Sequence, residues 1–378
     1  MKPLGPGSTI GVLGGGQLGR MMAIEARRMG YRVVVLDPSA RCPTAQVADG
    51  VVVGALDDLE SAKHLARQVD VITLDTEHVP ADILAELEKL VPVRPGASVL
   101  GTINDRQIQK QFLDKLGLPQ AQWAPATTEA ELAAALKQLG RPAILKVRSR
   151  GYDGKGQVRI EESSDASADL AKLRGAPVVA EELVRFKREI SVILARGIRG
   201  EVRTYPIAEN VHRRHILHTT RAPAPMTPAT QKRAEEIGVT VAKQLGHVGV
   251  IAVEMFELAG GQLLVNEIAP RTHNSGHYTW GACVTSQFEQ HVRAVCGQPL
   301  GDPTAMSGSV MVNLIGDLWH SGPPKWDTVL ARPEARLHLY GKDLAAPGRK
   351  MGHVLLLDDD TDRALEAADQ LVSTLSRA

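Results

Sequence analysis

The stretch Leu145–Gln157 reads LKVRSRGYDGKGQ, and it predicts both the central fold and the site. Lys146 lies in the apolar run Ala143–Val147, which favours a buried strand, and a buried ammonium is costly unless it meets an anion. Three closely spaced glycines follow, with a lysine among them, which is typical of a donor-rich loop that closes over a triphosphate. A hairpin turn with a solvated lysine is the alternative. Because Lys146 and the loop Gly151–Gln157 occur together, we favour a nucleotide site.

Two acids further along the chain lie in otherwise apolar runs. Glu254 and Glu267 stand on either side of Ala259–Gly261, which is a clear hairpin signal. Two carboxylates on paired strands repel each other unless a cation lies between them. Mg²⁺ prefers oxygen ligands and bridges phosphates, and Asn266 adds a neutral oxygen. A pair of solvated acids at a sheet edge is the alternative to this predicted Mg²⁺ site.

Two neighbouring segments are candidates for substrate contacts. Val178–Val184 reads VVAEELV and favours a strand that lines an adenine, with Glu189 near a ribose hydroxyl; ordinary strand residues are the alternative. Pro270–His277 is dense in polar groups and directly follows the predicted metal strand. A loop in that position is expected to contact a substrate.

A second glycine loop lies near the N-terminus, where Ile10–Gly19 reads IGVLGGGQLG. It satisfies GxGxxG between a strand and a helix, and Asp37 closes the second strand. Glycines let the backbone approach a phosphate, and a helix N-terminus offers free N–H donors to an anion. The pattern fits NAD or FAD, a phosphate or another substrate, or a purely structural turn. No hydride-transfer constellation accompanies it, so we favour phosphate or substrate binding.

Periodicity divides the chain into three parts. Residues 1–100 alternate apolar runs with helix formers, which predicts a parallel α/β sheet covered on both faces. The second part, after Pro95 and Gly96, favours a mixed α+β arrangement of antiparallel strands, and a small third block begins after Pro303. The strands expected in the second part are Ala143–Val147, Gln157–Ile160, Val178–Glu181, Glu189–Ala195, Val202–Ile207, Val250–Glu257 and Gln262–Ile268.

Composition excludes several classes of protein. The 378 residues carry 44 basic and 43 acidic side chains, and this balance argues against a general nucleic-acid binder. The three cysteines show no CxxC spacing, which disfavours a disulfide framework or a zinc site and favours a reducing cytoplasm. Neither a signal peptide nor an apolar run of about 18 residues is visible, so we expect no membrane partner.

Long strings of the chain resemble the ATP-grasp enzymes and, within them, the 5-(carboxyamino)imidazole ribonucleotide synthases of purine biosynthesis. The strings GYDGKGQ at Gly151–Gln157 and NEIAPRTHNSGH at Asn266–His277 are the most specific. Others are GGGQLGRM at Gly14–Met21, NDRQIQKQFLDKLGLP at Asn104–Pro119, GHVGVIAVEMF at Gly246–Phe256, SQFEQHVRAV at Ser286–Val295, SVMVNLIG at Ser309–Gly316 and PGRKMGH at Pro347–His353.

The resemblance implies an ATP-grasp fold with a Rossmann-like pre-ATP-grasp domain over 1–100, an ATP-grasp domain over 101–300 with a lid subdomain at about 120–185, and a C-terminal domain over 301–378. By position it implies ATP contacts from Arg106, Lys146, Gly151, Tyr152, Asp153, Gly154, Lys155, Gly156, Gln157, Glu181, Glu182, Leu183, Val184, Glu189, His212, Asn266 and Glu267. It implies contacts to the second substrate from Gly16, Gln17, Leu18, Glu77, Tyr152, Asp153, Lys155, Arg271, His273, Asn274, Arg349 and Lys350.

The implied activity is the carboxylation of 5-aminoimidazole ribonucleotide with bicarbonate and ATP, giving ADP and phosphate through carboxyphosphate. Glu254 and Glu267 are expected to ligate Mg²⁺, and the implied catalytic residues are Lys146, Arg271, His273 and Asp153. The resemblance also suggests a homodimer. Three rivals remain: another ATP-grasp ligase such as a formate-dependent glycinamide ribonucleotide transformylase, a nicotinamide-dependent oxidoreductase, and a non-catalytic nucleotide-binding protein.

Overall fold

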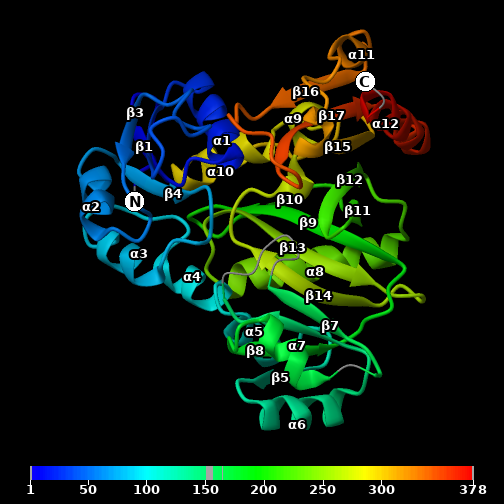
Figure 1. The fold of residues 1–378 in the computed structure, drawn as a ribbon. Coiled ribbons are helices and arrows are strands. Elements are labelled where there is room, and N and C mark those ends of the chain that lie inside the picture. The colour runs from blue at the N-terminus through cyan, green and yellow to red at the C-terminus, as the bar shows by residue number, and fades with distance from the viewer. Residues whose placement is uncertain (1, 150–155, 164, 377–378) are drawn as a thin grey trace.

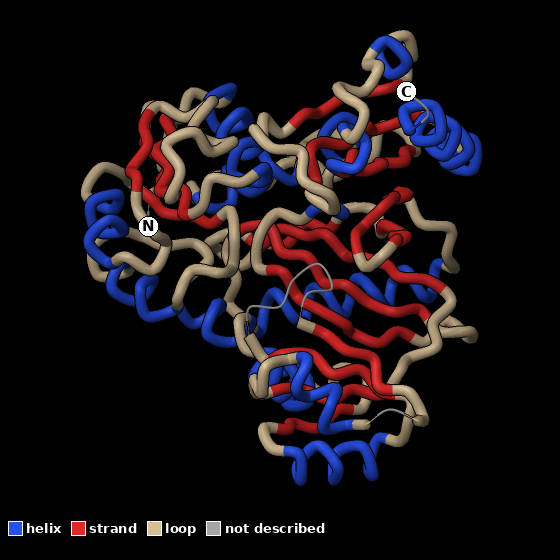
Figure 2. The backbone as a smooth tube through the Cα atoms, viewed as in Figure 1, coloured by secondary structure: helices blue, strands red, loops and turns tan. Residues whose placement is uncertain are grey.

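The structure is a computed structural model that describes residues 2–149, 156–163 and 165–376. The strands in these ranges form three sheets (Figures 1 and 2). In Figure 1 a large central sheet lies between an N-terminal lobe, coloured blue to cyan, and a small sheet at the bottom of the view. In the described ranges, helices fall short of the length and apolar character needed to cross a bilayer.

The N-terminal lobe is built on a four-stranded parallel sheet in the order β3-β2-β1-β4. Apolar side chains alternate between its two faces, so both faces are buried. The helices α1 (Gln17–Arg28) and α10 (Gln287–Val295) cover one face, and α2, α3 and α4 cover the other. This confirms the predicted two-faced α/β sheet, whose other elements are β1 (Thr9–Leu13), β2 (Arg32–Asp37), β3 (Gly50–Val53), β4 (Val71–Leu74), α2 (Leu59–Ala66), α3 (Ala81–Leu87) and α4 (Ala97–Ile103).

The central sheet is antiparallel throughout, in the order β14-β13-β9-β11-β12-β15-β17-β16, with β10 paired to β9. The long helix α8 (Pro228–Gln244) packs on one face, against Ile190, Val192 and Leu194 of β9. The strands are β9 (Arg188–Arg196), β10 (Val202–Thr204), β11 (Ala208–Arg213), β12 (Ile216–Ala222), β13 (Gly249–Glu257), β14 (Leu263–Ala269), β15 (Ser309–Ile315), β16 (Ala335–Leu339) and β17 (Lys350–Leu357).

The C-terminal strands continue the central sheet, because β15 pairs with β12 from Thr219 to Ala222. The terminal helix α12 (Thr361–Ser376) packs on this part of the sheet through Ala368 and Leu371. Short helices complete the region: α9 (Thr279–Ala282), α11 (Asp327–Leu330) and the 3₁₀ turns Asn274–Gly276 and Gly316–Trp319.

The small sheet has the antiparallel order β5-β8-β6-β7 and carries the opening motif of the sequence. The helix α6 (Glu129–Leu139) covers it, begins with a capping box between Thr128 and Glu131, and stops at Gly140, which has a φ of 80°. The remaining elements are α5 (Arg106–Lys115), α7 (Ala166–Lys172), β5 (Trp123–Ala126), β6 (Ala143–Val147), β7 (Gln157–Ile160) and β8 (Val178–Glu182).

The sequence did not predict the strand β5 or the hairpin β11–β12. The strand β5 contains Pro125, and a proline within a short run argues against a strand unless it lies at an edge, which is where β5 lies. The hairpin β11–β12 turns at Arg214 and His215, which have φ values of 52° and 65°. Such turns favour Asn-Gly or Asp-Gly, so this pair gave no hairpin signal.

Buried histidines at the junction of the lobes predict acid sensitivity. His291 contacts Thr73 of β4 and accepts from the Val250 N–H of β13, and His247 lies beside it. Burial lowers the pKa of His291 to about 3 and that of His247 to about 4. The histidines of the unfolded chain have pKa values near 6.5. At pH values between the folded-state and unfolded-state pKa values, the unfolded chain therefore binds more protons than the folded chain.

We therefore expect the free energy of unfolding to fall as the pH drops below about 6.5, by up to about 1.4 kcal/mol per pH unit for each such histidine. Urea unfolding at pH 8, 7, 6 and 5 measures this slope. The variant His320→Gln, at an exposed site, should leave the slope unchanged. A urea midpoint that stays constant from pH 8 to pH 5 would contradict the prediction.

Candidate active site

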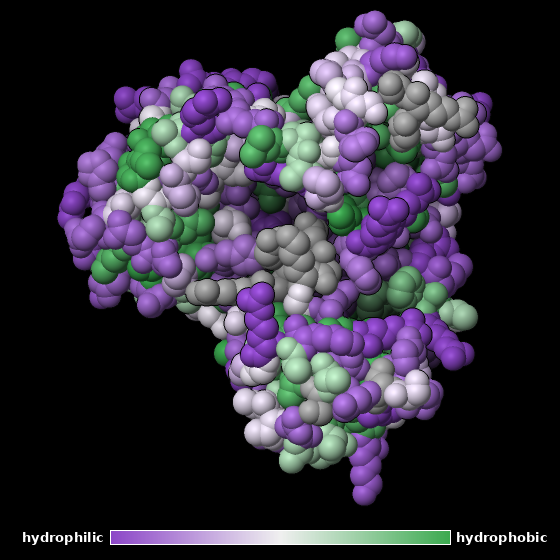
Figure 3. Space-filling view, in the orientation of Figure 1, coloured by the Kyte–Doolittle hydropathy of each residue, from purple (hydrophilic) through white to green (hydrophobic). Residues whose placement is uncertain are grey.

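A cavity of about 690 Å³ lies where the N-terminal lobe, the small sheet and the central sheet meet. Figure 3 shows the surface hollowed at this place and lined by hydrophilic side chains. The described residues around it extend from Gln17 to Lys350, so the cavity draws on almost the whole length of the chain. A volume of this size lies in the range expected for small-molecule sites.

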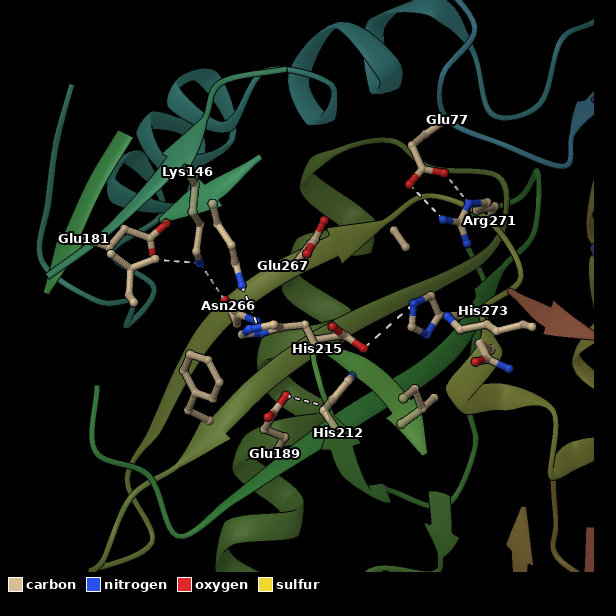
Figure 4. A pocket seen from close by; sticks show the side chains of 18 of the residues that line it. Glu77, Lys146, Glu181, Glu189, His212, His215, Asn266, Glu267, Arg271 and His273 are labelled. Carbon is tan, nitrogen blue, oxygen red and sulfur yellow. Dashed lines mark hydrogen bonds and ion pairs between the residues drawn. The ribbon is translucent and has the colours of Figure 1, made fainter. Parts of the chain in front are cut away.

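Lys146 reaches this cavity from the strand β6. Its Nζ donates to Glu181 Oε2 at 3.0 Å and to Asn266 Oδ1 at 3.2 Å (Figure 4). Glu181 belongs to β8 of the small sheet, whereas Asn266 belongs to β14 of the central sheet. The lysine therefore joins the two sheets across the cavity, and its buried ammonium has the anionic partner that the sequence required.

Glu254 and Glu267 lie directly opposite each other on the paired strands β13 and β14. Burial raises the pKa of Glu254 to about 7, and the Glu267 carboxylate adds to this effect. Such a pair fits a divalent cation, which would favour both ionised forms. Within the described ranges, clusters of three or more His, Cys, Asp or Glu suited to a metal are absent, so oxygens of substrate or water would complete the shell.

A third pair lines the same wall of the cavity. Glu189 of β9 and His212 of β11 face each other, with His212 Nδ1 3.1 Å from Glu189 Oε2 (Figure 4). Burial alone would lower the pKa of His212, but the Glu189 carboxylate raises it above its ordinary value. The pair places a carboxylate and an imidazole beside the predicted metal acids.

Arg271 and Glu77 join the N-terminal lobe to the central sheet at the other end of the cavity. The guanidinium binds the carboxylate through two nitrogens, and Nη2 lies 2.8 Å from Oε1 (Figure 4). Burial alone would raise the pKa of Glu77, but Arg271 lowers it to about 2, so the carboxylate stays ionised. Both side chains are less than one-fifth exposed.

His273 stands between this ion pair and the metal acids. Its Nδ1 lies 2.8 Å from Ser275 Oγ and 3.3 Å from the Ser275 backbone nitrogen, and its Nε2 lies 3.8 Å from Glu254 Oε1. The contacts with Ser275 hold the ring in place. Its Nε2 edge therefore faces the cavity and the metal acids.

Three N–H groups of the N-terminal glycine loop donate to carboxylates. Asp75 accepts from the N–H groups of Gly16 and Gly19 at 3.0 and 2.6 Å, and Asp37 accepts from the Gly15 N–H at 2.8 Å. A pyrophosphate would meet these two carboxylates in place of open N–H groups. This arrangement argues against the NAD or FAD alternative, and Gln17 of the loop lines the cavity wall.

Three known domain families match the chain in succession. The ribonucleotide synthetase preATP-grasp domain matches residues 7–104, the ATP-grasp domain matches residues 111–288, and the phosphoribosylaminoimidazole carboxylase C-terminal domain matches residues 309–367. An N5-carboxyaminoimidazole ribonucleotide synthase from Brucella melitensis is 46% identical over 353 residues, which are 93% of this chain and 96% of the relative. This chain belongs to the N5-carboxyaminoimidazole ribonucleotide synthases.

Other members of this family agree in sequence and in structure. The Bacillus subtilis synthase is 41% identical, covering 96% of this chain and 94% of the relative. An ADP complex of an N5-carboxyaminoimidazole ribonucleotide synthetase superposes with a TM-score of 0.94 at 41% identity, covering 98% of each chain. The Aspergillus clavatus synthase, solved with ADP and 5-aminoimidazole ribonucleotide, superposes with a TM-score of 0.88 at 34% identity, covering 98% of this chain and 99% of that one. The ATP-grasp fold and the family implied by the sequence are thus confirmed.

The structure brings most of the implied site residues of this ATP-grasp family to the one cavity. Glu182, Leu183 and Val184 line it beside Glu181, and Leu18, Asn274 and Lys350 line it elsewhere. Gln157 begins β7, pairs with Lys146 of β6 and lines the cavity, and Gly156 lies in the turn just before it. The implied residues Gly151, Tyr152, Asp153, Gly154 and Lys155 lie outside the described residues.

Four of the implied residues that the structure describes do not line this cavity: Arg106, Gly16, Gly156 and Arg349. Arg106 lines a smaller neighbouring hollow of about 180 Å³ and pairs with Glu267 at 3.5 Å. The Gly16 N–H donates to Asp75. Arg349 is exposed, and its guanidinium donates to the Leu344 carbonyl, so the structure gives it no contact with the cavity.

Sequence reasoning missed other residues that shape the site. His215 lines the cavity from the β11–β12 turn and lies 3.2 Å from the Gln157 amide nitrogen. Phe186 and Phe256 stack with ring centroids 4.6 Å apart at the apolar end of the cavity. Lone aromatic residues and a histidine in a turn carry no motif, so only the fold could identify them.

Proposed function

We propose that this chain carboxylates 5-aminoimidazole ribonucleotide with bicarbonate and ATP, releasing ADP and phosphate, in purine biosynthesis. The observation that carries the proposal is one cavity with two chemically distinct ends. Lys146 and the opposed acids Glu254 and Glu267 form a nucleotide end, and Glu77 and Arg271 lie at the other end. Two substrates can therefore meet within one cavity.

At the nucleotide end, the residues position ATP and neutralise its charge. The base would pack in the apolar region near Phe256 and Val184, and Lys146 would contact the phosphates. Glu254 and Glu267 would hold Mg²⁺, which when bound neutralises phosphate oxygens. A bicarbonate oxygen then attacks the γ-phosphorus, the bond to the ADP oxygen breaks, and carboxyphosphate forms.

At the acceptor end, the exocyclic amine attacks the carboxyl carbon, the C–O bond to the phosphate breaks, and the departing phosphate takes up the proton that the amine loses. Arg271 and the His273 imidazole would orient bicarbonate and carboxyphosphate, while Lys350 offers a cation to the ribonucleotide. The bidentate contact with Glu77 fixes the plane of the Arg271 guanidinium. Asp153 stays a predicted catalytic residue. Excluding water protects the labile intermediate.

The decisive assay measures phosphate release from ATP. We expect bicarbonate and 5-aminoimidazole ribonucleotide together to raise the rate by at least about tenfold, because the acceptor draws the intermediate forward. Formate with glycinamide ribonucleotide should give no such rise. Equal rates with and without the aminoimidazole ribonucleotide would refute the acceptor, and stimulation by formate would favour a transformylase.

We also propose Mg²⁺ as the metal, a homodimer as the assembly and the cytoplasm as the location. All three cysteines, Cys42, Cys283 and Cys296, are buried free thiols, which supports a reducing compartment. Sedimentation velocity at micromolar concentration tests the dimer. Monomeric behaviour across that range would refute it.

A further inference from the structure

Lys110 is a buried lysine behind the nucleotide end of the cavity. It lies on α5, is only 4% exposed, and does not line the cavity. Its Nζ lies 3.4 Å from Glu181 Oε1, while the other oxygen of the same carboxylate accepts from Lys146. One buried carboxylate therefore stands between two ammonium groups, and only Lys146 reaches the substrate side.

The cluster of Lys110, Glu181 and Lys146 has one more positive charge than it has negative charges. Burial alone would raise the pKa of the Glu181 carboxyl, but Lys146 and Lys110 lower it, so the group is ionised. With both lysines protonated, Glu181 carries one negative charge and its two partners carry two positive charges. Burial lowers the pKa of Lys110, whereas the Glu181 carboxylate raises it. An arriving anion compensates the excess positive charge of the buried cluster.

We infer that Lys110 is a positioning residue, which neutralises Glu181 so that Lys146 keeps its charge for the phosphates of the nucleotide. Without Lys110, Glu181 would pair with Lys146 alone, and the buried cluster would become neutral. The inference rests on the proposed nucleotide site, and it assigns a role to a side chain that makes no contact with the substrate.

Geometry supports the same role. Lys110 is held from behind by Gln120, whose Nε2 donates to the Lys110 carbonyl at 2.9 Å and whose Oε1 lies 3.4 Å from Nζ. The backbone of Gln120 also forms a β-bridge with Val265 of β14, so Lys110 is held on the side of the central sheet, whereas Glu181 and Lys146 belong to the small sheet. The Lys110–Glu181 contact thus fixes the position of Lys146 as well as its free charge.

The test compares the ADP dissociation constants of wild type and Lys110→Met, measured by calorimetry with MgCl₂. We expect the constant to rise about tenfold in the variant, because the cluster loses its excess charge. The KM for ATP should rise while kcat changes less. Lys115→Met, at an exposed site on the same helix, is the matched control and should bind ADP as wild type does.

A second substitution separates charge from structure. In Lys110→Met combined with Glu181→Gln, Lys146 regains its unpaired charge, so ADP affinity should return to within about threefold of wild type. Affinity that stays low in the double variant would overturn the inference, as would unchanged affinity in Lys110→Met. The double variant leaves no unpaired carboxylate in the buried cluster. If Lys110→Met does not fold, the ADP affinity of the double variant alone tests the inference. Wild-type protein that fails to bind ADP would refute the nucleotide site itself.

Discussion

Glu267→Gln should abolish ATP turnover, by at least about a thousandfold, while leaving the fold intact. Glu267 faces Glu254 across two paired strands, and its removal leaves the predicted cation with one carboxylate. Because the Glu267 side chain is 41% exposed and the change relieves repulsion, the melting temperature should not fall. Phosphate release measures turnover, and thermal unfolding monitors the fold.

The Mg²⁺ dependence of ADP binding tests the metal role of Glu267 independently of turnover. ADP affinity in the wild type should be higher with MgCl₂ than with EDTA, and this difference should vanish in Glu267→Gln. Glu236→Gln, at an exposed site on α8, is the control and should keep both turnover and the Mg²⁺ effect. A fully active Glu267→Gln variant would refute the metal assignment.

Arg271→Met should destabilise the protein by about 3–5 kcal/mol and remove its activity, because it leaves the Glu77 carboxylate buried without its partner. The two side chains connect the N-terminal lobe to the central sheet, so the loss acts at a domain junction. Urea unfolding at neutral pH measures the change in free energy. Lysine at this position cannot reproduce the bidentate contact and should also be inactive.

The double variant Glu77→Gln with Arg271→Met separates stability from chemistry. Removing both charges should recover most of the lost unfolding free energy, since no unpaired charge remains. Activity should stay absent, because the guanidinium that orients the reacting anion is missing. If the double variant regained activity, Arg271 would be a structural residue only.

The sequence predicted those parts of the fold that depend on local patterns of apolar and polar side chains. The apolar runs around Lys146, Glu254 and Glu267 predicted strands, and these strands form within one or two residues of the expected bounds. Their polar residues stood out against apolar neighbours, and that contrast identified the nucleotide end of the site. The chain positions of Glu77 and Arg271 gave no sign that they pair, since 194 residues separate them.

The features that the sequence did not predict depend on contacts between residues that lie far apart in the chain. GxGxxG predicted free N–H donors in the N-terminal loop, but Asp75, about 60 residues away along the chain, accepts from two of these N–H groups. The burial of Lys110 could not be read from α5, where it is one of several polar residues. The turn at Arg214 and His215 adopts a conformation that these residue types rarely choose, so tertiary context overrides the local preference.

The pairing of β12 with β15 has a consequence for synthesis of the chain. Until residues 309–315 leave the ribosome, β12 exposes an unpaired edge, which is a template for unwanted association between nascent chains. Lys350, the last cavity residue along the sequence, begins the strand β17 that pairs with β15. The N-terminal lobe is also incomplete until α10 has been synthesised, because α10 covers one face of its sheet. A ribosome-bound fragment that ends before residue 350 therefore lacks a complete pocket, and substrate can stabilise only the nearly finished polypeptide.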